Sequence, residues 1–201
     1  MSTSRPTVPP SVRRSVLKEF NHRCAICGGD NPQIHHIDEN PANNDPQNLL
    51  PLCPNHHLTD QHSPTRKHDQ GILRLFRKFK DPAILKPQFQ PLYIRFKFIE
   101  TLATDSNVDS GSIVSRARDL TNFIKPMEMG SYYSEVIDNL LMPPPMHLHI
   151  TVTDPEMIRQ QNIQFLRERT GPHKTKILEA RDRIIGLLIE LLRFQNWPDT
   201  K

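Results

Sequence analysis

The chain has 201 residues, a net charge of +4 and an apolar content of 36%. This length is enough for one domain or two small ones, each with a modest core. No run approaches the roughly 18 apolar residues that cross a membrane, and the first residues lack the apolar stretch of a signal peptide. We therefore expect a soluble, cytoplasmic protein with no membrane partner.

The basic residues are unevenly distributed along the chain. Residues 67–100 carry eight Lys or Arg side chains against three Asp or Glu, whereas the parts on either side are close to neutral. A local excess of positive charge attracts polyanions. The distribution therefore favours a nucleic acid as partner.

Hydrophobic periodicity and turn residues divide the N-terminal part into helices and a pair of strands. The predicted elements are a helix at 11–21, strands at 33–37 and 48–53, a short helix at 55–61 and a longer helix at 64–80. Ser63 is expected to be the N-cap of the last helix, with Pro64 as its first residue.

Prolines organise the C-terminal part. Three of them interrupt residues 81–91, which are predicted to be a linker. Beyond it we expect helices near 92–104, 110–125 and 131–141, a short strand at 147–153, a helix start at Asp154 and a final helix at 172–197. This final helix is apolar almost all round, so it is expected to be buried in a core or in a homodimer interface.

Three cysteines and one histidine form two short-spaced pairs. Two residues separate Cys24 from Cys27, and two separate Cys53 from His56. Four such ligands in two pairs are typical of a closed tetrahedral zinc site, which contributes folding free energy to a small domain. An odd number of cysteines without a secretory signal disfavours a disulfide framework. The sequence therefore predicts a structural Zn²⁺ held by these four residues.

A second set of polar residues is interleaved with the zinc ligands. His35 and His36 are adjacent in a predicted strand, so their side chains point to opposite faces. Asn48 precedes the next strand, and His57 directly follows the second pair. A histidine with an ordinary pKa near 6.5 suits a general base at neutral pH, and a divalent ion with open positions suits phosphodiester hydrolysis.

The order of these elements resembles the HNH endonuclease family in its zinc-stapled form. CAIC at 24–27, HHI at 35–37, NLLPL at 48–52 and CPNHH at 53–57 are similar to the family's CxxC, (D/H)HI, Asn before an apolar strand, and CxxCH. The resemblance covers about 40 residues. It implies a ββα-metal fold that hydrolyses DNA with Mg²⁺, Mn²⁺ or a similar ion and leaves 5′-phosphate and 3′-hydroxyl ends.

The resemblance also implies a role for each residue. His35 and His57 would bind the catalytic divalent ion. His36 would be the general base that takes a proton from the attacking water. Asn48 would hold His36 in orientation through hydrogen bonds across the loop between the strands.

Two features depart from the family pattern. His56 stands where the family usually has Cys, and the family order assigns it to zinc and His57 to the catalytic ion. Many members have a further histidine four residues after the helical ligand, where this chain has Gln61. His62 lies about 100° further round an α-helix. His62 and Asp60 are candidates for a third ligand, but a two-ligand site completed by water and phosphate is the simpler expectation.

The segment at 71–80, GILRLFRKFK, predicts an amphipathic helix beside this core. Its charged side is either an ordinary solvated face or a surface that contacts the DNA backbone without reading sequence. The candidate backbone contacts are Arg74, Arg77, Lys78 and Lys80.

Together these features predict an α+β protein in two parts. Residues 1–80 would form the HNH nuclease domain, with its core at 24–62, and residues 92–201 a mainly helical targeting, oligomerisation or regulatory region. The resemblance suggests a bacterial or phage setting of defence, restriction or mobile elements, with a regulatory partner or ligand as a further hypothesis. The alternative is a non-catalytic zinc-stapled nucleic-acid-binding module.

Overall fold

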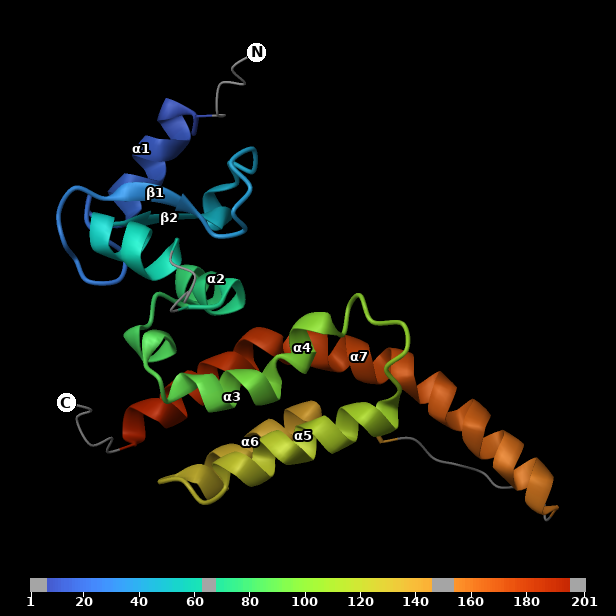
Figure 1. Cartoon of the computed structure of the whole chain (residues 1–201). Coiled ribbons are helices and arrows are strands. Elements are labelled where there is room, and N and C mark those ends of the chain that lie inside the picture. The colour runs from blue at the N-terminus through green and yellow to red at the C-terminus, as the bar shows by residue number, and fades with distance from the viewer. Residues whose placement is uncertain (1–6, 63–67, 146–153, 196–201) are drawn as a thin grey trace. The chain divides into compact units, whose positions relative to one another are not determined.

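A computed structural model describes residues 7–62, 68–145 and 154–195 (Figure 1). The described chain is mostly helical, with one small antiparallel sheet of two strands, which agrees with the α+β prediction. It divides into two compact units between Lys86 and Pro87, inside the predicted linker. Unit 1 comprises residues 1–86 and unit 2 comprises residues 87–201.

Unit 1 consists of a two-stranded sheet with helices around it. In chain order its elements are α1 (Pro10–Glu19), β1 (Gln33–His36), the 3₁₀ turn η1 (Pro46–Asn48), β2 (Leu49–Leu52), the π-helical segment η2 (Asn55–Gln61), α2 (Gln70–Phe79) and the 3₁₀ turn η3 (Pro82–Leu85). Both predicted strands are confirmed, each shorter by one residue at one or both ends. β1 pairs with β2 so that His35 lies opposite Leu50 and His36 opposite Leu49.

The core of unit 1 forms between β2, α1 and α2. All four residues of β2 are buried, whereas in β1 Gln33 is exposed, Ile34 and His36 are half-buried and His35 is buried. The buried apolar side chains include Val16, Ile37, Leu49, Leu50, Leu52, Ile72, Leu73, Leu75 and Phe76. This core is small, so further links between the elements contribute to holding them together.

Arg77 of α2 links three segments of unit 1. Its guanidinium donates two hydrogen bonds to the Glu19 carboxylate, at 2.8 and 2.6 Å, and one to the Pro46 carbonyl at 3.2 Å. Lys80 donates to the same carboxylate. The paired hydrogen bonds from Arg77, more than any other contact, lower the pKa of Glu19 to about 2. Helix α1, the turn η1 and helix α2 are thereby joined at one carboxylate.

The start of α2 differs from the prediction. The helix begins at Gln70, and the Asp69 side chain accepts a hydrogen bond from the Gly71 amide at 2.7 Å, as an N-cap does. The predicted N-cap Ser63 lies outside the described residues. Pattern alone did not distinguish the two caps, because both polar residues precede an apolar periodic run.

Unit 2 is entirely helical in the part that the structure describes. Its helices are α3 (Phe89–Phe96), α4 (Phe98–Thr101), α5 (Ser110–Ile124), α6 (Gly130–Leu141) and α7 (Pro155–Phe194). α5 and α6 lie side by side, and both pack on α7 (Figure 1). A Cβ on Gly130 would overlap the Ile124 carbonyl, so the close turn between α5 and α6 requires glycine there.

Helix α7 corrects the prediction of two separate C-terminal helices. Asp154 caps it as expected, accepting hydrogen bonds from the next amides, but the helix then continues through Pro172 for 40 residues. His173, the residue after the proline, has a hydrogen-bond partner at both ring nitrogens. Its Nδ1 lies 2.8 Å from Ser110 Oγ, and its Nε2 lies 2.7 Å from the Leu141 carbonyl. These buried contacts hold the helix where the proline removes a backbone hydrogen bond. The strand expected at 147–153 lies outside the described residues.

The apolar side chains of residues 177–192 in α7 are buried. Ile177, Ile184, Ile185, Leu188, Ile189, Leu191 and Leu192 are each at most 4% exposed. Packing in the core, one of the two alternatives from the sequence, therefore accounts for these side chains. Within the described residues, no helix combines the length and the apolar composition needed to cross a membrane.

Candidate metal centres

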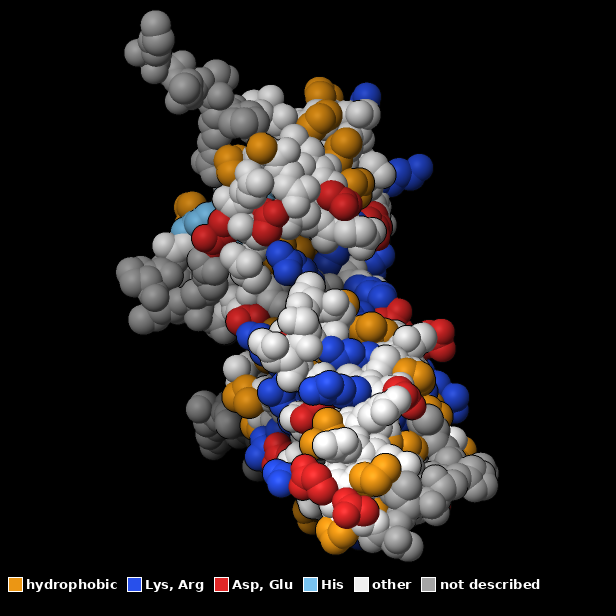
Figure 2. All heavy atoms as spheres, turned by 90° about the vertical axis from the view of Figure 1, so that its right-hand side faces the viewer, with side chains coloured by type: hydrophobic (Ala, Val, Ile, Leu, Met, Phe, Trp, Pro, Cys, Tyr) orange, Lys and Arg blue, Asp and Glu red, His pale blue; other side chains and the backbone are white. Residues whose placement is uncertain are grey.

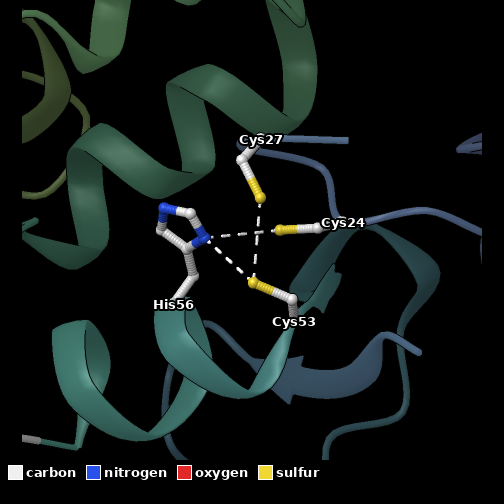
Figure 3. Close-up of side chains that lie close together, drawn as sticks. All are labelled: Cys24, Cys27, Cys53 and His56. Carbon is white, nitrogen blue, oxygen red and sulfur yellow. Dashed lines mark hydrogen bonds between the residues drawn. The ribbon is translucent and has the colours of Figure 1, made fainter. Parts of the chain in front are cut away.

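The two short-spaced pairs converge on one point in unit 1, as Figure 3 shows. Cys27 Sγ lies 3.8 Å from Cys53 Sγ, and His56 Nδ1 lies 3.7 Å from Cys24 Sγ and 3.2 Å from Cys53 Sγ. A tetrahedral zinc ion with Zn–S near 2.3 Å and Zn–N near 2.1 Å separates two sulfurs by about 3.8 Å and a sulfur from a nitrogen by about 3.6 Å. The donor atoms therefore fit a Cys₃His zinc site.

The backbone around the first pair is shaped for this purpose. Gly28 has a φ of +71°, and the next amide, of Gly29, donates to Cys27 Sγ at 3.4 Å. The Ala25 amide donates to the Pro51 carbonyl of β2 at 2.7 Å. The loop is thus fixed to the strand that leads into Cys53 and the second pair.

The electrostatics favour a thiolate at Cys53. The backbone hydrogen bond from His56 is the largest of the causes that lower the pKa of Cys53 to about 6. At Cys27, burial and the neighbouring Cys24 and Cys53 sulfurs outweigh the Gly29 backbone hydrogen bond and raise the pKa. The thiolate is the form that binds metal. A deprotonated sulfur in a buried site without a cation would be costly, which supports a metal ion as its partner.

Asp60 belongs to this first centre. Its carboxylate lies 3.7 Å from His56 Nε2, the ring nitrogen that faces away from the sulfurs. A carboxylate near the outer nitrogen of a histidine ligand orients the ring and raises its basicity. The sequence made Asp60 a candidate third ligand of the catalytic ion. In the structure Asp60 lies beside His56 and is not part of the group formed by His35, His57 and His62.

Three histidines form a second cluster in unit 1: His35 from β1, and His57 and His62 from η2 and its C-terminal end. One ring nitrogen of each lies within 4.8 Å of the others, and His57 Nε2 is 3.2 Å from His62 Nε2. The three rings meet edge to face, with centroids 4.7 to 5.4 Å apart. A cation about 2.1 Å from two imidazole nitrogens separates them by about 3.0–3.4 Å. The cluster therefore fits a three-histidine metal site.

Exposure within the cluster is graded. His35 is 3% exposed, His57 is half-buried and His62 is exposed. Figure 2 shows pale blue histidine side chains at the molecular surface. The cluster is therefore anchored on its His35 side and accessible to solvent on its His62 side.

The π-helical form of η2 explains why His62 joins the cluster. In an α-helix, a residue five positions after His57 is turned about 140° away from it. A π-helix bonds i to i+5 and brings these two residues onto one side. Gln61, the position expected from α-helical spacing, is 1% exposed and outside the cluster. The structure thus brings His62, a candidate third ligand, beside His35 and His57.

Gln33 holds His57 in a defined tautomer, a role that sequence reasoning missed. Its Oε1 lies 2.9 Å from His57 Nδ1, and because an amide oxygen only accepts, Nδ1 carries the proton. Nε2 then presents its lone pair toward the cluster. Gln33 and His35 lie two positions apart on β1, so both side chains point to the face that η2 covers. The i, i+2 spacing is the signal that could have revealed this residue.

His36 lies next along β1 and is turned to the other face of the strand. Its Nε2 is 3.2 Å from Asn44 Oδ1. The oxygen accepts from Nε2–H, which leaves the lone pair of a neutral ring on Nδ1. The residue that contacts the predicted base is therefore Asn44, not Asn48.

Asn48 instead closes the loop between the strands. Its side chain accepts from the Asp38 amide at 3.1 Å, and it donates to the Asp38 carboxylate at 2.8 Å and to the Asn43 carbonyl at 3.0 Å. These bonds cross the loop as expected, but they position Asn44 by holding its neighbour Asn43. The action of Asn48 on His36 is thus indirect.

The predicted DNA contacts of α2 separate into two groups. Arg77, which is 2% exposed, and Lys80 both donate hydrogen bonds to the Glu19 carboxylate within unit 1. Arg74 and Lys78 are exposed. The periodic pattern placed all four on one charged surface, but it could not show that Glu19, distant in sequence, engages two of them.

Neither a family model, nor a curated protein, nor a solved structure matches this chain. The function is therefore argued from the two clusters and the residues around them.

Proposed function

We propose that unit 1 is a metal-dependent HNH-type endonuclease that hydrolyses DNA phosphodiester bonds. The observation that carries the proposal is the convergence of His35, His57 and His62 at the end of the strand that also bears His36. A binding module needs neither a three-histidine cluster nor a neighbouring imidazole with a fixed tautomer. Hydrolysis uses a bound metal ion and a general base, and these groups are of the kind that supplies them.

In this proposal His36 is the general base. Asn44 accepts from its Nε2–H and keeps Nδ1 unprotonated. Nδ1 takes a proton from a water molecule as the water oxygen attacks the phosphorus. The P–O3′ bond breaks and the 3′ oxygen takes a proton from solvent, which leaves a 5′-phosphate and a 3′-hydroxyl end.

The histidine cluster would hold the divalent ion, which supplies charge stabilisation for the phosphoryl oxygens when bound. Gln33 sets the tautomer of His57, so that its Nε2 is available as a ligand. Three imidazoles suit first-row transition ions better than Mg²⁺, which prefers oxygen ligands. We therefore expect Mn²⁺, Ni²⁺ or Co²⁺ to support cleavage better than Mg²⁺.

The zinc site has a separate, structural part in the proposal. Its four protein donors leave no open position for a substrate. It fixes the loop at residues 24–27 and the start of η2. There the His57 amide donates to the Cys53 carbonyl at 2.8 Å. The site thereby positions one ligand of the histidine cluster.

The test is a plasmid-nicking assay with each divalent ion, on wild type and on His36→Ala. A loss of 10²-fold or more in rate is expected for the variant, because a positioned general base contributes about that much. The matched control is His22→Asn: His22 is exposed, and asparagine tolerates its φ of +58°. Equal rates for His36→Ala and wild type would exclude His36 as the base. Retained DNA binding with no cleavage by wild type under any ion would favour the non-catalytic binding module.

A further inference from the structure

A hollow of about 510 Å³ lies beside α1, in unit 1. Val8, Leu17 and Ile34 give it a half-buried apolar floor, and Arg13 and Arg14 stand in its lining. Among the described residues outside the two clusters, it combines a concave surface with exposed charge.

The cations of α1 are available for a ligand. Arg13, Arg14 and Lys18 are exposed, and none has an ion pair or side-chain hydrogen bond within the described residues. The acidic residue of α1, Glu19, is occupied by Arg77 and Lys80 of α2. The positive charge beside the hollow is therefore uncompensated within its own helix. On the face of unit 2 visible in Figure 2, by contrast, basic and acidic side chains are interspersed.

The hollow lies on the same side of β1 as the proposed base. Ile34 and His36 are two positions apart on the strand, so their side chains point to one face. The distance between these positions along a strand is about 7 Å. That is on the order of two nucleotide rises in a DNA strand. A backbone that places one phosphate at His36 thus reaches the hollow within a nucleotide or two.

We propose that this hollow binds the sugar–phosphate backbone of duplex DNA beside the scissile phosphate. Arg13 and Arg14 pair with two successive phosphates, and the apolar floor receives the deoxyribose between them. These contacts position the duplex and carry no sequence preference. The inference rests on the proposed nuclease function and assigns the substrate surface to α1 rather than to the predicted cations of α2.

The test measures binding separately from cleavage. A fluorescent 20-base-pair duplex is titrated by anisotropy in the His36→Ala background, with the further change Arg13→Ala/Arg14→Ala. We expect at least a tenfold loss of affinity, and a salt dependence, plotted as log K against log salt, that is shallower by about 1.8 because two phosphate contacts are lost. In the cleavage-competent chain, the same double variant should raise KM and leave kcat within about twofold.

The matched control is Arg23→Ala, which removes an exposed arginine of the same unit that is paired with Asp30 at 3.0 Å. Its affinity and salt slope should equal those of the parent. If the double variant behaves like this control, the hollow is not the DNA surface, whether or not the protein cuts. If wild type fails to cut although binding depends on the two arginines, the nuclease proposal fails and the surface stands. Tighter binding of a double-stranded RNA of equal length would contradict the assignment to DNA.

Discussion

The side chain of Gln33 accepts a hydrogen bond from the Nδ1–H of His57 across a distance of 2.9 Å. This contact joins β1 to η2 at the point where the two elements contribute to one cluster. It fixes the orientation of a ring that would otherwise rotate about χ2, and it directs Nε2 inward.

Replacement of Gln33 should therefore weaken metal binding without unfolding the domain, because the residue is exposed. We expect Gln33→Ala to lower the affinity of the histidine cluster for Mn²⁺ by 10- to 100-fold, the usual effect of losing such a partner. Gln33→Glu retains an acceptor and should restore most of the affinity. Calorimetric titration on the zinc-loaded chain measures both. Equal affinities for the alanine variant and wild type would exclude the positioning role.

Removal of His62 should show whether the histidine cluster binds its ion through three ligands or two. His62→Ala deletes the exposed member of the cluster and leaves the more buried His35 and His57 in place. We expect at least a tenfold loss of Mn²⁺ affinity and a matching rise in the Mn²⁺ concentration needed for half-maximal cleavage. His22→Asn is again the control. An unchanged metal requirement would exclude His62 as a ligand.

Loss of the zinc ligands should affect folding before chemistry. Cys53→Ser removes a buried donor that contacts both Cys27 and His56. We expect the zinc content, measured by elemental mass spectrometry, to fall from about one ion per chain to near zero, and the amides of unit 1 to exchange rapidly with deuterium. Unit 2 should keep its protection. A variant that retains full protection in unit 1 would show that the zinc site is dispensable for the fold.

The contact between Glu19 and Arg77 should make unit 1 sensitive to acid. The pKa of Glu19 lies at about 2 in the folded chain against an ordinary value of 4.5, so the folded state binds the proton less tightly than the unfolded state. The stabilisation is therefore complete above pH 4.5 and is lost as the pH falls toward 2. Urea unfolding of wild type and Glu19→Gln between pH 2 and 7 should differ at neutral pH and converge in acid. Asp30→Asn, at an exposed pair, should change little.

The sequence predicted what depends on local spacing. The strands around His35 and Leu50 follow from short apolar runs bounded by turn residues, and the grouping of Cys24, Cys27, Cys53 and His56 follows from two short pairs; both predictions are confirmed. These features are local or repeat a common ligand pattern. They do not depend on how distant segments pack.

The remaining features depend on backbone form and long-range pairing. α-Helical spacing predicted that His62 lies about 100° round the helix from the expected ligand position. The π-helical form of η2 instead brings His62 into the cluster. Arg77 was taken for a surface cation because its partner, Glu19, is 58 residues away. Pro172 was taken for a helix start, yet the anchored His173 allows α7 to continue. Neither periodicity nor composition contains this information.

The adjacency of His56 and His57 has a thermodynamic consequence. One residue donates to the sulfur cluster and the next to the histidine cluster, so a single peptide unit connects the two sites. Occupancy of one site then restricts the backbone from which the other is built, and the two binding free energies become linked. Because linkage is reciprocal, an ion in the histidine cluster should retard the release of zinc to a chelator. The two ions would then be bound cooperatively, each raising the affinity of the other's site by the same factor.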